Sequence, residues 1–279
     1  MPQSQSHLAP YLLALALLIG AVALLLRLFT RQLADWPPWV RLTLAATTAG
    51  GVIGAPFWWA GIPGSFAWTP APLAFRFLAV AGLAFATVGV QVMARPESPR
   101  LRALMAMLTL YLVPLVGVIL ILHADRLDWQ APVVWGFVTI AGGLGLAALA
   151  GLARIPVARP GPASPQRWLW TVAAALFLLW GLALFAWPAG PVAALWLWPA
   201  DALTSRLIGA MLLTIGLMAA LAARRADLAG LMASGIAVYG LGVALACLLH
   251  AAAGRPLPWA YLGTLGIAGA LAALRTLRR

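Results

Sequence analysis

Long runs of apolar residues, separated by arginines or by clusters of proline and glycine, dominate the chain. These runs cover residues 8–26, 39–60, 72–93, 102–122, 131–153, 168–187, 202–222, 229–250 and 257–274. Each is close to the ~20 residues with which an α-helix crosses a bilayer. Apolar and polar positions do not alternate as in a barrel strand, and backbone groups inside a bilayer must be paired within the protein. The pattern predicts an all-α polytopic membrane bundle of nine transmembrane helices.

The run at 39–60 is the most polar of the nine. It contains Arg41, several threonines, and Gly50 and Gly54 one helical turn apart. Small residues at this spacing let two helix backbones approach closely in a membrane. We therefore expect this run to be a transmembrane helix that packs tightly against a neighbour.

The composition excludes a water-soluble globular protein. The chain has 279 residues, of which 64% are hydrophobic and 9% charged, with a mean hydropathy of +0.97. Soluble domains have about 45–50% apolar and 25% charged residues. The net charge is +12, and all 18 basic residues are arginines. They stand singly or in small groups between apolar runs, which argues against a nucleic-acid partner, because that needs a basic face on a folded domain.

The arginines instead predict how the chain crosses the membrane. When the loops are assigned alternately to two sides, four arginines fall on one side: Arg76, Arg126, Arg206 and Arg255. The other 14 fall on the opposite side. Positive residues mark the cytoplasmic side. We expect a multi-pass protein of the inner (plasma) membrane, with its N-terminus outside and its C-terminus in the cytoplasm. The first run has no basic residue before it, which favours a retained helix over a cleaved signal peptide.

The second half of the chain repeats the first at a constant offset of 130 residues. Rare residues carry the match: Trp68 and Trp198, Arg76 and Arg206, Arg95 and Arg225, and Trp129 and Trp259. The predicted organisation is a first helix and loop (1–35), a four-helix repeat A (36–153), a cytoplasmic linker (154–167) and a four-helix repeat B (168–279). Because four crossings return the chain to the same side, both repeats enter the membrane in the same direction, which is a parallel repeat.

Residues 206–245, RLIGAMLLTIGLMAALAARRADLAGLMASGIAVYGLGVAL, resemble the small four-helix membrane units of uncharacterised bacterial proteins of the DoxX-like kind. The resemblance rests on an Arg-x-x-Gly start followed by spans rich in Ala, Leu and Gly. In repeat A, Ala79 replaces the glycine. The resemblance implies a bundle fold in a bacterial inner membrane and no particular activity.

Arg76 and Arg206 are the best candidates for ligand binding. Each lies about one turn inside the outer end of its span, after an uncharged loop rich in Trp, Pro and Gly. Guanidinium groups there, with Trp68, Trp198 and Asp201 nearby, are suited to grip a phosphate or carboxylate. The structural alternatives are arginines that reach toward outer-leaflet phosphates, and an ion pair between Arg206 and Asp201.

A second polar group is expected at the outer face, from His123, Asp125, Asp128 and His250. A histidine with two carboxylates suits zinc or acid–base chemistry, but residues at loop tips more often end helices. The sequence has no H-E-x-x-H, Walker, G-x-S-x-G or G-x-G-x-x-G motif. We therefore expect no catalytic residue, metal or cofactor. The single Cys247 excludes an intramolecular disulfide.

The sequence favours a non-enzymatic bundle that binds membrane lipids, an anionic lipid or amphiphile, or another membrane protein. The alternative is a transporter or exporter of an anionic or amphiphilic solute. All six acidic residues lie in loops or at helix ends, which disfavours a proton-coupled carrier, because such carriers need a buried proton relay. A membrane transferase or hydrolase that uses His123 and His250 is the third possibility.

Overall fold

The computed structural model describes residues 8–68, 70–159, 161–195 and 201–277. These ranges contain nine α-helices and two short 3-10 helices, η1 (Ala124–Arg126) and η2 (Pro191–Leu195), and no strand. The α-helices are α1 (Leu8–Leu28), α2 (Pro38–Trp59), α3 (Pro72–Ala94), α4 (Ser98–Leu122), α5 (Pro132–Arg154), α6 (Arg167–Ala186), α7 (Ala202–Arg224), α8 (Ala226–Ala252) and α9 (Trp259–Leu277). The all-α prediction is confirmed.

Proline sets the start of four of these helices. Pro38, Pro72, Pro99 and Pro132 stand in the first turns of α2, α3, α4 and α5. At this position the missing N–H is not needed and the fixed φ suits a helix. The prediction began the fourth helix at residue 102, whereas α4 begins at Ser98. The helix begins before the apolar run because Pro99 favours a first helical turn there, and Arg100 in that turn forms an ion pair with Glu97 at 3.6 Å.

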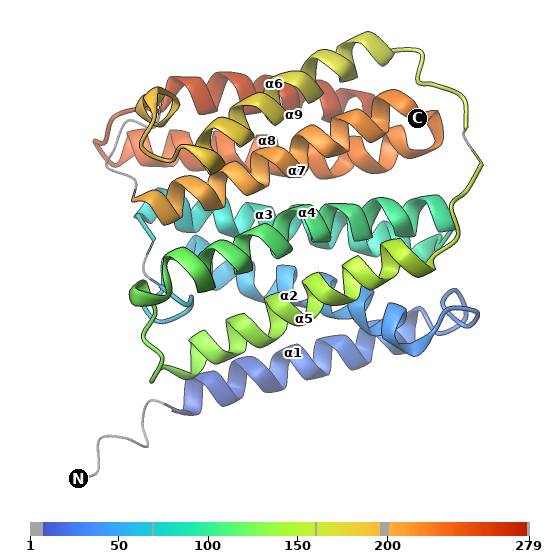
Figure 1. Cartoon of the computed structure of the whole chain (residues 1–279), viewed down its shortest axis with the longest axis horizontal. Helices are drawn as coiled ribbons and strands as arrows, with labels where there is room; N and C mark the ends of the chain where they lie inside the picture. The colour runs from blue at the N-terminus through green and yellow to red at the C-terminus, as the bar shows by residue number, and fades with distance from the viewer. Residues whose placement is uncertain (1–7, 69, 160, 196–200, 278–279) are drawn as a thin grey trace.

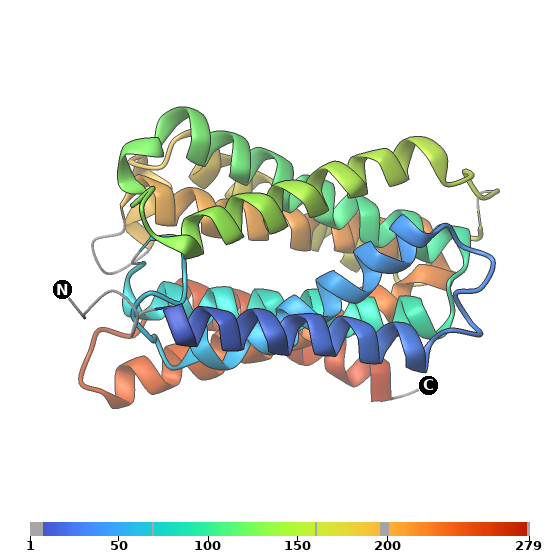
Figure 2. The same cartoon turned by 90° about the horizontal axis from the view of Figure 1, so that it is seen from below.

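The helices run side by side along one direction, with all connections at the two ends (Figure 1). The end with loops 29–37 and 95–97 and the segment 155–166 is called here the arginine-rich end. The opposite end, with loops 60–71, 123–131 and 253–258, is called the tryptophan-rich end. In Figures 1 and 2, α1 begins at the tryptophan-rich end and α9 finishes at the arginine-rich end.

Eight helices in the described part of the chain are long and apolar enough to cross a membrane. Only α2 among the nine falls outside that group, in line with its Arg41 and its threonines. The chain is therefore a multi-pass membrane protein. α2 nevertheless packs against α1, α3 and α5, so it lies inside the bundle.

Helix packing follows a regular scheme. α2 packs on α3 and α6 packs on α7, while α4 packs on α5 and α8 packs on α9. The centre of the bundle is built from α3, α4, α7 and α8, where α3 contacts α8 and α4 contacts α7. No residue in the spanning part of α1 is buried, so most of its surface faces the surroundings.

Glycines allow the closest helix approaches. A Cβ atom on Gly181 of α6 would lie 2.8 Å from the carbonyl oxygen of Gly209 in α7. On Gly51 of α2 it would collide with the carbonyl oxygen of Gly82 in α3. Such close backbone contact increases dispersion packing, which drives helix association in a membrane. The run at 39–60 packs closely against a neighbour through Gly51, not through the expected pair of Gly50 and Gly54. A Cβ on Gly50 would have nothing within 4 Å, and the atoms nearest to a Cβ on Gly54 belong to Trp58 of its own helix.

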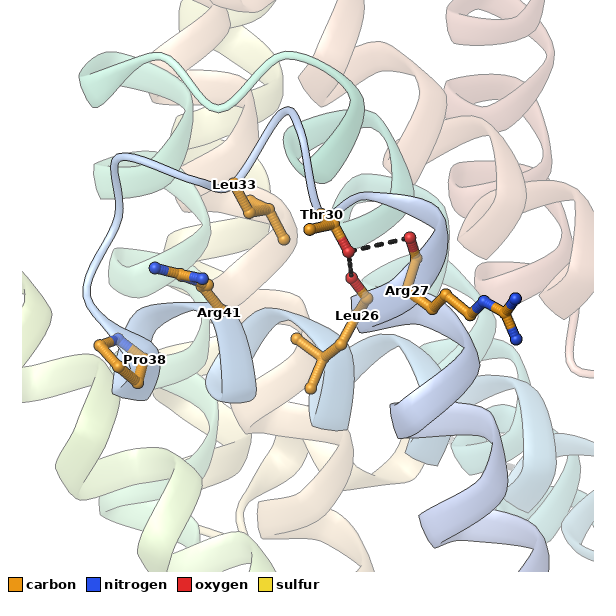
Figure 3. A pocket seen from close by; sticks show the side chains of 6 residues that line it. All are labelled: Leu26, Arg27, Thr30, Leu33, Pro38 and Arg41. Carbon is orange, nitrogen blue, oxygen red and sulfur yellow. Dashed lines mark hydrogen bonds between the residues drawn. The ribbon is translucent and has the colours of Figure 1, made fainter.

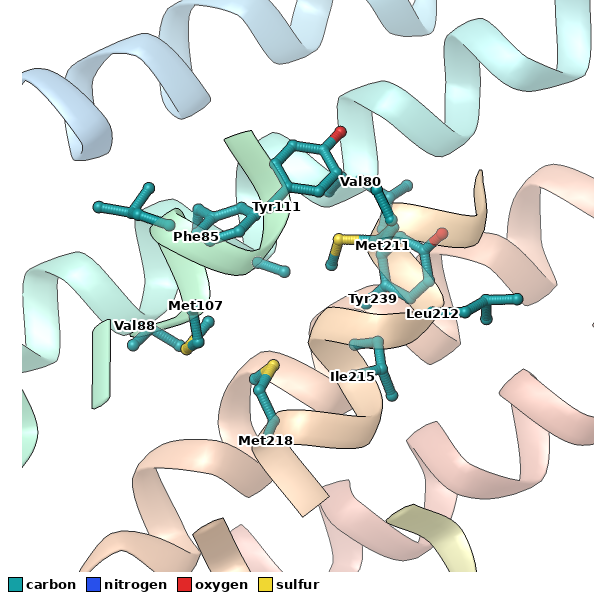
Figure 4. Packing of buried hydrophobic residues seen from close by; sticks show 14 of the residues in the cluster. Val80, Phe85, Val88, Met107, Tyr111, Met211, Leu212, Ile215, Met218 and Tyr239 are labelled. Carbon is teal, nitrogen blue, oxygen red and sulfur yellow. The ribbon is translucent and has the colours of Figure 1, made fainter. Parts of the chain in front are cut away.

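Apolar side chains from α3, α4, α7 and α8 meet at the centre (Figure 4). They enclose a void of about 10 Å³, lined by Phe77, Leu78, Ala81, Tyr111, Leu207, Ile208, Met211 and Tyr239. A side-chain hydrogen bond also joins α3 to α8 nearer the arginine-rich end, where Gln91 Nε2 donates to Ser234 Oγ at 2.6 Å.

The segment between α5 and α6 is attached to the arginine-rich end. Arg102 Nη1 donates to the carbonyl oxygens of Leu152 at 2.7 Å and Ile155 at 2.6 Å. Further along, the Ser164 N–H donates to the Ala223 carbonyl at 3.2 Å, and Arg275 Nη2 donates to Ser164 Oγ at 3.3 Å. The segment predicted as a linker is thus held by α4 at its start and by α7 and α9 further on.

Candidate functional site

Arg206 contacts His123 at the tryptophan-rich end. Arg206 lies in the second turn of α7, and His123 directly follows the last residue of α4. Arg206 Nη1 is 2.6 Å from His123 Nε2, and Arg206 Nε donates to the Phe185 carbonyl at 3.2 Å. The structure therefore joins a residue predicted for the ligand site to one predicted for the outer polar group.

The surroundings of His123 favour its neutral form. Partial burial lowers the pKa of its imidazole below the usual 6.5, and the charge of Arg206 lowers the pKa further. Asp125 and Asp201 act in the opposite direction on this pKa, and Arg126 adds a small lowering effect. Arginine has donors only, so Nε2 is the acceptor in this hydrogen bond, and the ring proton is on Nδ1.

Arg76 also lies near a histidine, His250, at the tryptophan-rich end. Arg76 lies in the second turn of α3, and His250 is buried in the last turn of α8. Arg76 and Arg255 are close enough to act electrostatically on His250. The Arg76 Cζ atom lies 5.9 Å from the centre of the Trp59 ring, which is a cation–π contact. Each candidate arginine is thus associated with a histidine at the end of a helix far along the chain.

In the described part of the chain, neither candidate arginine forms an ion pair with a carboxylate. Within the described ranges, ion pairs are formed by Arg100 with Glu97, Arg126 with Asp125, and Arg225 with Asp227, and none involves Arg76 or Arg206. Asp201 caps α7 instead, since its Oδ1 accepts from the Thr204 N–H at 2.7 Å. The ion pair between Arg206 and Asp201 that the sequence offered as a structural role is therefore not formed. Both arginines are half-buried.

Of the two tryptophans predicted for the site, Trp68 lies in the described part of the chain. Trp68 is 8% exposed and packs edge-on against Phe66 at 4.4 Å and Phe137 at 5.8 Å. It belongs to an aromatic cluster, and Trp59 occupies the place beside Arg76. This exchange could not be predicted, because Trp59 reaches Arg76 through the packing of α2 against α3. Trp198 lies outside the described residues.

The remaining predicted residues shape the loop after α4. Asp125 is exposed and pairs with Arg126 at 3.9 Å, and Asp128 Oδ1 accepts from the Gln130 N–H at 3.0 Å. These contacts stabilise the turn at η1. In the part of the chain that the structure describes, no three His, Cys, Asp or Glu residues are grouped so as to hold a metal ion.

The arrangement is suited to binding an anion. It offers two partly buried arginines near the ends of their helices: Arg206 is hydrogen-bonded to neutral groups, and Arg76 lies against the Trp59 ring. Partly buried charged donors with fixed geometry bind phosphate and carboxylate groups more strongly than exposed ones. No protein-family model, curated protein or solved structure matches this chain.

Proposed function

We propose that this chain is a non-enzymatic protein of the bacterial inner membrane that binds an anionic lipid or amphiphile at its outer end. The observation that carries the proposal is that Arg76 and Arg206 lie half-buried without a carboxylate partner in the described part of the chain. An uncompensated charge within a span is costly, and a lipid phosphate at the interface would offset that cost. An acidic group on another membrane protein is the second kind of partner for the same arginines.

The proposal includes the parallel repeat, with a first helix followed by α2–α5 as repeat A and α6–α9 as repeat B. When each helix is matched with its counterpart in the other repeat, the contact of α2 with α3 corresponds to that of α6 with α7. In the same way, the contact of α4 with α5 corresponds to that of α8 with α9, and the contact of α3 with α8 to that of α7 with α4. All of these contacts are present. Phe77 and Leu207, Leu78 and Ile208, and Ala81 and Met211, which are 130 residues apart, line the same central void. These relations support a pseudo-twofold axis through that void, along the membrane normal. We also propose that the chain crosses the membrane nine times and that α2 is the second of these crossings.

The orientation is proposed from charge. Arg27, Arg31, Arg41, Arg95, Arg100, Arg102 and Arg154 all belong to the arginine-rich end. The positive-inside tendency assigns this end to the cytoplasm. The arginine and histidine pairs then lie at the periplasmic side, in the outer leaflet of the inner membrane.

The test is the double variant Arg76→Gln and Arg206→Gln in the full chain. Native mass spectrometry of the purified protein would measure retained anionic lipid. Each charge-assisted hydrogen bond contributes about 1.5–3 kcal/mol, so we expect retention to fall at least about tenfold.

Arg126→Gln is the matched control, because Arg126 lies at the same end but is exposed and paired with Asp125. It should retain lipid like the wild type. Equal retention by the double variant and the wild type would refute the lipid-binding proposal.

Transport of an anionic or amphiphilic solute is the second candidate function. The observation that favours it is that α3 contacts α8 and α4 contacts α7 at the centre of the bundle. The void there, about 10 Å³, is too small for a solute, so transport would require these helices to separate. Carriers with parallel repeats bind their substrates between the repeats near the bilayer centre. Flux of an organic anion into proteoliposomes that falls in Tyr111→Phe would support this candidate, and the absence of flux across a solute panel would remove it.

A further inference from the structure

A cavity of about 410 Å³ lies at the arginine-rich end, between the last turn of α1 and the first turn of α2 (Figure 3). Its lining residues are Leu26, Arg27, Thr30, Leu33, Pro38 and Arg41. This volume lies within the range of small-molecule sites, about 300–1,000 Å³. None of these residues belongs to the site at the tryptophan-rich end.

Arg41 provides a fixed positive charge at this cavity. Its Nε donates to the Trp36 carbonyl at 2.6 Å, and its Nη2 donates to the Ala34 carbonyl at 3.0 Å. In the described part of the chain, Nη1 has no hydrogen-bond partner and Asp35 forms no ion pair with Arg41. Because its partners are neutral carbonyl oxygens, the guanidinium is held in place without being neutralised.

Arg27 adds a second, movable charge. Its side chain is exposed and extends away from the cavity in Figure 3, whereas its carbonyl oxygen accepts from Thr30 Oγ1 at 2.9 Å. The guanidinium forms no hydrogen bond or ion pair with any described residue. A long arginine side chain can reorient at an interface to meet a phosphate.

The cavity lies next to an apolar surface that suits the hydrocarbon chains of a lipid. Ile19 and Leu15 of α1, which lie seven and eleven residues before Leu26 on the same helix face, are 60% and 49% exposed, so an apolar helix surface continues from the cavity toward the centre of the membrane. A charged rim above an apolar surface complements a molecule with an anionic head and hydrocarbon chains. Juxtamembrane arginines are attracted to anionic lipids by about 1 kcal/mol each.

We propose that this cavity binds the phosphate of an anionic phospholipid, with Arg41 as the fixed donor and Arg27 as the movable one. One acyl chain lies along the exposed face of α1. The site is separate from the one under Proposed function, since it uses other residues at the opposite end of the bundle. The bound lipid would lie between α1 and α2, in the membrane leaflet at the arginine-rich end.

The test uses the full chain in nanodiscs that contain phosphatidylglycerol with a photoactivatable group in its head. Crosslinks are mapped to the tryptic peptide of residues 32–41, QLADWPPWVR. We expect this peptide to be labelled in the wild type and labelling to fall about fivefold in Arg27→Gln. Since Arg27 holds no other residue, the variant should fold normally.

Arg159→Gln is the matched control, because Arg159 is an exposed arginine in the segment 155–166 at the same end. It should label like the wild type, as should Arg76→Gln with Arg206→Gln, which separates this site from the other. Unchanged labelling in Arg27→Gln would overturn the proposal. Equal labelling by a phosphatidylcholine probe, or loss of labelling in millimolar inorganic phosphate, would overturn the assignment to an anionic lipid.

Discussion

Arg206 Nη1 and His123 Nε2 lie 2.6 Å apart, so a hydrogen bond ties the beginning of α7 to the end of α4. The two residues are 83 positions apart in the chain. The bond requires a neutral imidazole, because a protonated histidine has no lone pair to accept from the guanidinium. The contact between α4 and α7 therefore depends on pH.

The first prediction concerns this titration. Since the folded-state pKa of His123 is lowered below 6.5, the unfolded chain binds more protons between these two values. The free energy of unfolding should fall as the pH drops through 6.5 toward the lowered pKa, and should not depend on His123 above 6.5. Thermal unfolding of the wild type and His123→Gln between pH 8 and pH 5 measures this. A wild-type pH dependence that persists unchanged in His123→Gln would contradict it.

The second prediction concerns the cause of the shift. Removing the charge in Arg206→Gln should raise the pKa of His123, measured by NMR of the labelled imidazole. Arg126→Gln is the matched control, because Arg126 lowers this pKa less than Arg206 does. A larger rise in Arg126→Gln than in Arg206→Gln would show that the contact at 2.6 Å does not persist in solution.

The third prediction concerns the crossing of α6 and α7. In Gly181→Ala, the new Cβ would lie 2.6 Å from the Leu213 nitrogen and 2.8 Å from the Gly209 oxygen. Both are backbone atoms, so the helices must separate, which costs about 1–3 kcal/mol. Gly143→Ala is the control, since nothing lies within 4 Å of its new Cβ. Denaturant unfolding in detergent should show a loss for Gly181→Ala alone, and equal stability of the two variants would exclude the close crossing.

The helices could be predicted from the sequence because each apolar run is long and ends at arginine, proline or glycine. α3 was expected at 72–93 and spans Pro72–Ala94. The helix starts were less predictable at α4 and α8, where charged residues such as Arg100 and Asp227 lie inside the helix rather than before it. At a membrane interface, charged side chains reach water while their backbone stays helical.

The candidate site could be predicted only in part. The equal offset and loop context singled out Arg76 and Arg206, and both are half-buried in the second turn of a helix. Their partners could not be found in this way. The contact of Arg206 with His123 depends on the packing of α7 against α4, and the contact of Arg76 with Trp59 depends on the packing of α2 against α3. Neither relation has a fixed spacing along the chain.

The fourth prediction concerns the hydrogen bond between Gln91 and Ser234. Its length of 2.6 Å and its position between α3 and α8 predict that Ser234→Ala loses about 0.6 kcal/mol of stability, the average for such bonds in membranes. Thr171→Ala is a suitable control, because Thr171 Oγ1 donates only to Arg167 of its own helix. A double-mutant cycle with Gln91→Leu should give the same coupling energy, and a coupling near zero would mean that this bond does not join the helices.

The last prediction concerns the orientation and the role of α2. Cys247 is completely buried, so a cysteine added at an exposed position can be labelled selectively by a membrane-impermeant maleimide. If the arginine-rich end is cytoplasmic, Pro63→Cys should react in intact cells, and Asp35→Cys should react only after permeabilisation. These two exposed residues flank α2 in loops 60–71 and 29–37. The reverse result would invert the orientation, whereas reaction of both from the same side would mean that α2 does not cross the membrane, despite its packing on α1, α3 and α5.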